Sequence, residues 1–142
     1  MNDTVKLLRE CNSGIRMGES ALGHVVPKAR NKELKRALNT CKDEHAVLGD
    51  RTHSLLLRHS ADTSEAHAAA RMMSDAKVRI SMAVKRSDRT IASLMTDGCN
   101  MGVKSISKYL NKYKNASEEA KEIAKRLVDS ELALEENLRT FL

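Results

Sequence analysis

The sequence is poor in the residues that build strands, tight turns and aromatic cores. Aromatic residues make up 2% of the 142 positions, tryptophan is absent, and Pro27 is the only proline. Alanine, leucine, lysine, glutamate, arginine and methionine dominate instead, and these residues favour helix. We therefore expect an all-α protein with an aliphatic core, in which methionine fills irregular gaps.

Long apolar runs and a paired set of cysteines are missing as well. No apolar stretch approaches the roughly 20 residues of a membrane-spanning helix. The first residues lead straight into a polar amphipathic pattern, so we expect no signal peptide, no membrane contact and a cytoplasmic protein. The three cysteines, Cys11, Cys41 and Cys99, are odd in number and widely spaced, which argues against a disulfide framework. We expect each to pack in the core as a small apolar residue.

Motifs for phosphate binding and for hydrolytic catalysis are absent. There is no glycine-rich turn after a strand and no Ser-His-Asp arrangement. His45 lies one helical turn after Cys41, which makes these two residues the only candidate thiol–base pair. The net charge of +6 permits weak contact with polyanions. Because few aromatics accompany the lysines, we expect no nucleic-acid binding.

Apolar residues recur at steps of three and four, the period of amphipathic helices. The pattern predicts a first helix over about 3–26, which Asn2 or Asp3 can cap and Pro27 ends. A second helix starts after Asn31 and continues to about 59. A long segment over about 64–114 divides at Ser87 into a shorter and a longer helix. The last helix begins after Ser117, where two glutamates follow the cap residue, and runs to the end.

These helices predict one domain over 1–142. Short links favour antiparallel neighbours, so we expect an antiparallel up-down four-helix bundle with a short extra helix before the third long helix.

Polar residues lie inside two of the apolar stripes. Glu131 falls in the stripe of the last helix and His45 in that of the second, which reads Leu34, Leu38, Cys41, His45, Leu48 and Leu55. A carboxylate in such a place needs a cation, a hydrogen-bond donor, a proton or access to water. Helix bundles build metal sites from inward-facing groups of this kind, and carboxylate with imidazole suits iron, manganese or zinc. The candidate ligands are Glu19, Glu44, His45, Asp97 and Glu131. The alternative is a satisfied core histidine, with the acids paired to lysine or arginine at the rim.

The order of the predicted helices and several local sequence segments resemble the ferritin-like superfamily, and in particular small bacterial ferritin-like domains of unknown function. The resemblance covers nearly the whole chain and rests on the strings LLRECNSGIRMGESAL, CKDEHAVLGDRTHSLL, SDRTIASLMTDGCNMGVKSISKYLNKY and AKRLVDSELALEENLRTFL. It implies a four-helix bundle with a possible two-metal site, in which helices one and three each give a glutamate. Helices two and four each give a Glu-x-x-His pair.

This chain departs from that pattern at several positions. Glu19, His45 and Glu131 match, but Lys42 stands where the second helix would carry its glutamate and Leu134 where the fourth would carry its histidine. The third helix offers Asp97, Cys99 and Gly102 in place of a glutamate. A lysine inside a site for divalent cations repels metal and can pair with Glu131 or Glu19 instead.

We therefore expect a non-catalytic ferritin-like bundle with a degenerate polar cluster in its core and no cofactor. Surplus methionine and alanine at Met72, Met73 and 66–70 predict self-association as a homodimer. Two alternatives stay open. One is a di-metal iron or manganese protein of the storage or oxidoreductase type, and the other is a domain that binds a helical protein partner.

Overall fold

The computed structural model describes residues 2–59, 61 and 87–142, and all regular structure in them is helical. The four long helices are α1 (Asp3–Val25), α2 (Lys32–Arg58), α4 (Asp88–Lys112) and α5 (Glu118–Leu138). Short 3₁₀ turns follow α1 at Val26–Lys28 (η1) and α5 at Arg139–Phe141 (η2). The all-α prediction is thus confirmed for the described residues. The shorter helix predicted before Ser87 lies outside them.

Each long helix begins at a polar residue whose side chain accepts a hydrogen bond from the first turn. The bonds run from the backbone N–H of Val5 to Asn2 and from that of Leu34 to Asn31. In the other two helices they run from the N–H of Thr90 to Ser87 and from that of Ala120 to Ser117. These bonds satisfy N–H groups that have no partner within the helix. The four starting points are those that the cap residues predict from the sequence.

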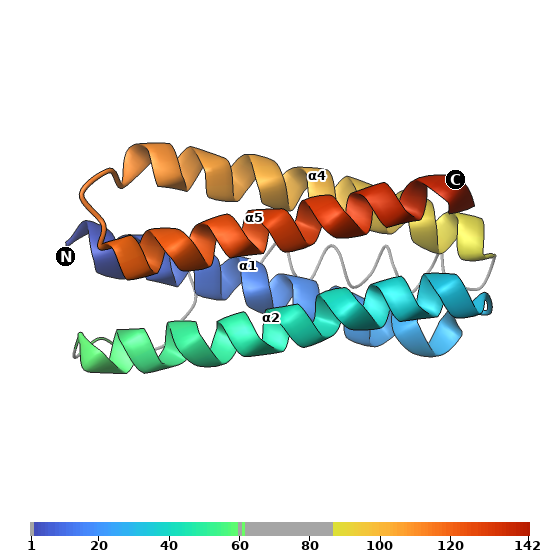
Figure 1. Cartoon of the computed structure of the whole chain (residues 1–142), viewed down its shortest axis with the longest axis horizontal. Coiled ribbons are helices and arrows are strands. Elements are labelled where there is room, and N and C mark those ends of the chain that lie inside the picture. Colours follow the sequence, from blue (N-terminus) through green and yellow to red (C-terminus); the bar gives the residue numbers. More distant parts are fainter. Residues whose placement is uncertain (1, 60, 62–86) are drawn as a thin grey trace.

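The helices form an elongated four-helix bundle (Figure 1). The contacts join α1 to α2, α2 to α5, α5 to α4 and α4 back to α1. In Figure 1, α1 and α5 run from left to right, whereas α2 and α4 run from right to left. Directions therefore do not simply alternate along the chain, because α2 and α4 share one. The connection over 59–87 is long enough for α4 to begin at the end of the bundle opposite to the end of α2.

Side chains at the helix starts hold the links at both ends. At one end, Asp88 accepts hydrogen bonds from the backbone N–H groups of Arg30 and Asn31, at 2.8 and 2.9 Å. At the other end, Asp3 accepts from the N–H of Asn115 at 3.0 Å. There the Thr4 hydroxyl also accepts from the N–H of Ser117, at 2.8 Å. Each link is thus tied to a helix distant in sequence, which limits how far the helices can slide along one another.

The core divides into two apolar clusters along the bundle axis. The N-terminal cluster is named for the end of the bundle at which the chain begins, and its buried residues include Leu7, Leu8, Ile15, Leu56 and Leu127. The C-terminal cluster is built from the other halves of the same helices and contains Leu22, Leu34, Leu38, Ile91 and Leu138. Among the described residues, we find no helix that combines the length and the apolar character needed to cross a bilayer.

Candidate functional site

The middle of the bundle, between the two apolar clusters, is occupied by a polar layer with one member from each helix. We define the central polar layer as Gly18 of α1, His45 of α2, Gly102 of α4 and Glu131 of α5. In every helix the member lies between a residue of the N-terminal cluster and one of the C-terminal cluster. Glu131, for example, lies between Leu127 and Leu134.

His45 is fully buried, and both of its ring nitrogens face oxygen atoms. Nδ1 lies 2.8 Å from the carbonyl oxygen of Cys41, one turn earlier in the same helix. Nε2 lies 3.1 Å from Oε1 of Glu131 on the neighbouring helix. A carbonyl oxygen only accepts, and an ionised carboxylate only accepts as well. Both contacts are satisfied when each ring nitrogen carries a proton, so the geometry favours an imidazolium paired with the Glu131 carboxylate.

The titration of His45 follows from these contacts. Burial lowers the pKa of an imidazole, because it disfavours the charged ring. Here the contacts with Cys41 and with the Glu131 carboxylate outweigh burial and raise the pKa of His45 from 6.5 to about 10. The Glu131 side chain is 12% exposed, so one side of the pair retains access to water. The His45 ring is therefore charged at neutral pH, while the Glu131 side of the pair keeps contact with solvent.

Two glycines make room for the pair. A Cβ built on Gly18 would lie 2.6 Å from Nε2 of His45, closer than real Cβ atoms approach. A Cβ on Gly102 would lie 3.3 Å from Cδ of Glu131, which is a tight contact. The imidazole thus lies against the backbone of α1, and the carboxylate lies against that of α4. The absence of a side chain at both positions lets one histidine and one glutamate fill the cross-section of the bundle.

A chain of hydrogen bonds extends the layer toward the surface. The Ser130 hydroxyl donates to Oε1 of Glu44 at 3.1 Å. Ser130 Oγ also lies 3.5 Å from Sγ of Cys41, which in turn lies 3.5 Å from Nδ1 of His45. A hydroxyl has one proton to donate. Because Ser130 gives that proton to Glu44, its oxygen can only accept in the contact with Cys41.

The thiols of Cys11 and Cys99 are held in the protonated form. Burial raises the pKa of Cys11 to about 12, and the nearby Glu10 carboxylate adds to the rise. Burial likewise raises the pKa of Cys99, and the Glu131 carboxylate beside that thiol raises it further. A thiolate is the reactive form of cysteine. The three cysteines are buried, and their surroundings are those of core residues.

The five candidate metal ligands lie in different surroundings. His45 and Glu131 are in direct contact, and Glu44 joins them through Ser130 and Cys41. Glu19 is half-buried on α1, where its Oε1 would lie 3.5 Å from a Cβ built on Gly49 of α2. Asp97 is exposed on α4. Nowhere in the described ranges do three or more histidine, cysteine or acidic side chains gather as they would to hold a metal ion.

Several members of the layer had only weak signals in the sequence. Gly18 interrupts the stripe of the first helix, and Gly102 lies beside the stripe of the third. Glycine inside a helix is unfavourable, so its presence points to a position where another helix approaches closely. Ser130 gave no signal, because a single serine beside Glu131 is ordinary on a helix surface.

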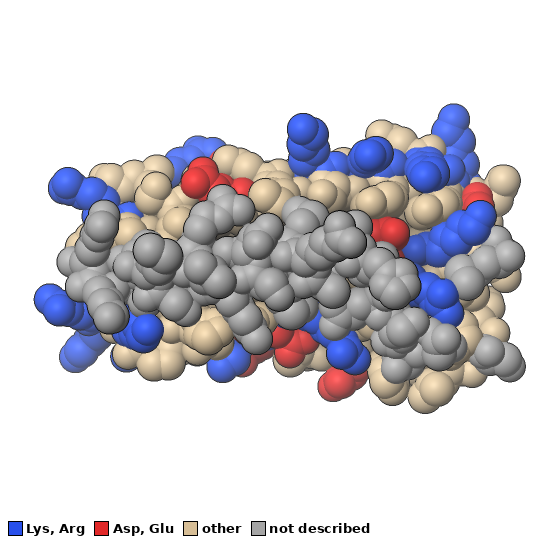
Figure 2. Space-filling view, turned by 180° about the vertical axis from the view of Figure 1, so that it is seen from behind, with Lys and Arg blue, Asp and Glu red and all other residues tan. Residues whose placement is uncertain are grey.

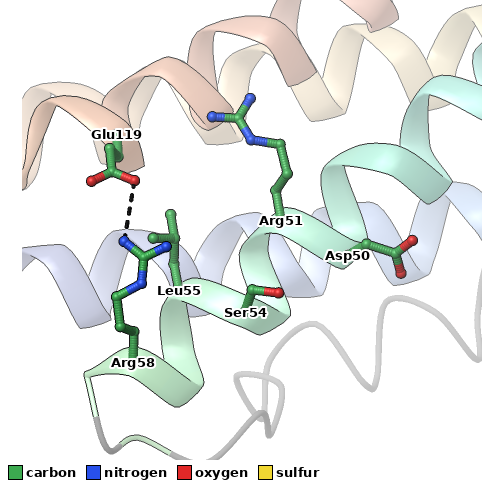
Figure 3. Close-up of a pocket in the computed structure, with 6 residues that line it drawn as sticks. All are labelled: Asp50, Arg51, Ser54, Leu55, Arg58 and Glu119. Carbon is green, nitrogen blue, oxygen red and sulfur yellow. Dashed lines mark ion pairs between the residues drawn. The ribbon is translucent and has the colours of Figure 1, made fainter.

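A second feature is a shallow pocket on the outer side of α2, facing α5 (Figure 3). Arg51 and Arg58 extend from α2 toward α5, where Arg58 pairs with Glu119 at 3.6 Å. Arg51 pairs with Glu122, also at 3.6 Å. Exposed ion pairs of this kind contribute about 0–1 kcal/mol. The cations of this pocket already have acidic partners, so it is a surface groove between two paired helices.

Comparisons with known proteins add no identity to this geometry. We find no match for the chain among protein-family models, among curated proteins or among solved structures.

Proposed function

We propose that this chain is a non-catalytic helical module of ferritin-like architecture, in which the central polar layer takes the place of a di-metal centre. The observation that carries the proposal is the satisfied state of His45. Both ring nitrogens have an oxygen partner, at 2.8 and 3.1 Å, so neither nitrogen is directed at an open position. A metal-binding histidine needs one nitrogen free for the ion, with the other held by a partner.

The role that the layer can serve is to fix the register of the helices. If α5 slid by one turn, Leu127 or Leu134 would face His45 in place of Glu131, and the buried imidazolium would lose its partner. Leaving a buried charge unpaired is strongly destabilising, by about 3–5 kcal/mol. Buried polar residues fix register and partner choice in helical assemblies in the same way. The layer is thus a device for specificity in a bundle that otherwise packs aliphatic side chains.

Metal analysis tests the proposal against its rival, a di-metal iron or manganese protein. The protein is purified without chelator and examined for iron, manganese and zinc by elemental analysis. We expect substoichiometric metal and an unchanged melting temperature on adding each ion. Stoichiometric metal that disappears in the Glu131→Ala variant would support the rival, because that change removes one ligand without removing the bundle.

The module would act through association with other helices in the cytoplasm, most simply as a homodimer. Two large apolar side chains of α2, Val47 and Leu57, are 58% and 60% exposed and are available for packing against another chain. Met72, Met73 and residues 66–70, which motivated this prediction, lie outside the described residues. Light scattering after size exclusion measures the mass directly. A mass that remains that of one chain at high concentration would refute the dimer.

A further inference from the structure

Three arginines on the α2–α5 face and three lysines on α4 differ in their partners. On the α2–α5 face, Arg51, Arg58 and Arg126 each form an ion pair with a glutamate, at 3.2–3.6 Å. On α4, the exposed residues Lys104, Lys108 and Lys112 form no ion pair with any described carboxylate. Lys and Arg side chains gather along the upper edge of Figure 2, the edge along which α4 runs in Figure 1.

These lysines form a straight row. Lys104, Lys108 and Lys112 follow one another at steps of four, so they share a face of the helix and rise about 6 Å per step. Met101 lies on the same face, one turn before Lys104 and two turns before Lys108, and is 41% exposed. Asp97 lies one turn earlier still and is exposed. The α4 face therefore reads acid, apolar residue, then three cations, along about 22 Å of one helix.

The neighbouring tyrosines do not offer free ring faces. Tyr109 and Tyr113 stack on each other, with centroids 6.0 Å apart and planes 7° apart. Lys108 lies 5.9 Å from the centre of the Tyr109 ring, and Lys6 and Lys112 lie 6.0 and 5.5 Å from that of Tyr113. Proteins that bind single-stranded nucleic acid stack bases on open aromatic faces. Here lysines and the neighbouring ring take those positions, so the surface is poorly suited to bases.

The acidic group that acts on this row is Glu10 of α1, whose charged form the Lys112 and Lys108 ammonium groups favour. Burial raises the pKa of Glu10, although the Lys112 ammonium, a hydrogen bond with Tyr109 and the Lys108 ammonium oppose the rise. Glu10 is thus held in the junction between α1 and α4. Glu10 therefore offsets part of the charge of Lys108 and Lys112, but within 2–59, 61 and 87–142 no carboxylate forms an ion pair with the row.

We propose that this α4 face docks an acidic amphipathic helix from another protein. The spacing defines the complementary pattern: three acids at steps of four opposite Lys104, Lys108 and Lys112, an apolar residue opposite Met101 and a cation opposite Asp97. A helix supplies acids at the same 6 Å step. A phosphate backbone would match the lysines but would leave Met101 without an apolar contact and would meet Asp97 with like charge.

The probe that tests this proposal is a synthetic helical peptide with the complementary pattern, and its control is a scrambled peptide of the same composition. Binding is measured by fluorescence anisotropy at low and at physiological salt. We expect the patterned peptide to bind at least about tenfold more tightly than the scrambled one, and to weaken as salt screens the charges. Equal binding of the two peptides would overturn the proposal.

Two charge-reversal variants locate the site. The triple change Lys104→Glu, Lys108→Glu and Lys112→Glu should abolish binding of the patterned peptide. The same change at three exposed lysines on other helices, Lys35, Lys42 and Lys125, alters the net charge equally and should leave binding nearly intact. Circular dichroism confirms that both variants fold. Equal loss in the two variants would show a general charge effect and refute a docking face on α4.

A 20-bp DNA duplex and vesicles containing anionic lipid are examined in parallel. We expect both to bind more weakly than the patterned peptide and without dependence on Met101. If either binds more tightly, and does so through the same three lysines, the surface belongs to that polyanion and the helical partner is wrong.

Discussion

The central polar layer and the apolar clusters on either side of it solve the same packing problem in different ways. In the clusters, leucine and isoleucine from all four helices fill the interior. In the layer, two helices contribute no side chain at all, and one histidine with one glutamate fills the space. The clusters would tolerate other aliphatic side chains of similar volume. The layer is more restricted, because the side chains of its ion pair fit only where Gly18 and Gly102 leave space for them.

This contrast separates stability from specificity. Replacing a buried ion pair by apolar residues of similar volume is often neutral or stabilising. We therefore infer that the clusters supply most of the free energy of folding, and that the proposed role of the layer is to select one among several similar packings. Changes that break one partner of the layer should be costly, and changes that replace the whole pair should not.

Removal of the Glu131 charge should have the largest effect. The Glu131→Gln variant leaves the His45 imidazolium without its counter-ion, and we expect a loss of about 3–5 kcal/mol in the free energy of unfolding. The matched control is Glu122→Gln, which removes a half-exposed partner of Arg51 and Arg126 and should cost about 1 kcal/mol or less. Urea denaturation measures both. Equal losses of unfolding free energy would show that the buried pair contributes no more to stability than an exposed ion pair.

The pH dependence of stability should come next in size. Because the pKa of His45 is raised from 6.5 to about 10 in the folded chain, its contribution is complete below pH 6.5. As the pH rises above 6.5 the unfolded chain releases its proton first, so stability falls until the folded pKa is passed. Urea unfolding at pH 6 and at pH 9 should show a loss of a few kcal/mol. In His45→Gln most of this slope should vanish, and a slope that persists would contradict the assignment.

The Gly18→Ala variant tests the close approach of α1 to His45. The added Cβ would lie 2.6 Å from Nε2, and the ring cannot move without losing its two hydrogen bonds. We expect a net loss of about 1–3 kcal/mol, as for other overpacked cores. Gly23→Ala is the control, because a Cβ there meets nothing within 4 Å and should stabilise α1 by up to about 1 kcal/mol. The two melting temperatures should move in opposite directions.

Replacing the pair as a whole should have the smallest effect on stability. The double variant His45→Leu, Glu131→Met removes both charges together, so we expect a change near zero or a small gain. The loss should appear instead as several packings, visible as broadened amide signals in NMR spectra. A double variant that is as unstable as Glu131→Gln would show that the pair itself drives folding.

Much of the fold follows from the sequence because its determinants are local. The cap residues Asn2, Asn31, Ser87 and Ser117 and the apolar period predict the helix starts. The stripes also placed His45 and Glu131 on inner faces, since burial has the period of the helix. The shared direction of α2 and α4 did not follow, because it depends on the long connection over 59–87 rather than on any local pattern.

The sequence predicted which residues of the candidate site face inward, but not the contacts between them. A stripe fixes which residues face inward but not which atoms of different helices meet. Asp97 lies two positions from each of the buried residues Met95 and Cys99, about 200° around α4 from them, so it falls on the exposed side of the helix. The hydrogen bond between Ser130 and Glu44 joins two helices across 86 positions of sequence, and no spacing within either helix reveals it.

The most direct test of this account is the protonation of the His45 ring. ¹⁵N NMR of histidine-labelled protein distinguishes an imidazolium, with both nitrogens protonated, from either neutral tautomer. We expect His45 to show both protonated nitrogens at pH 8 and to titrate near pH 10. A neutral ring at pH 8, with a midpoint near the ordinary 6.5, would contradict the charged pair between α2 and α5.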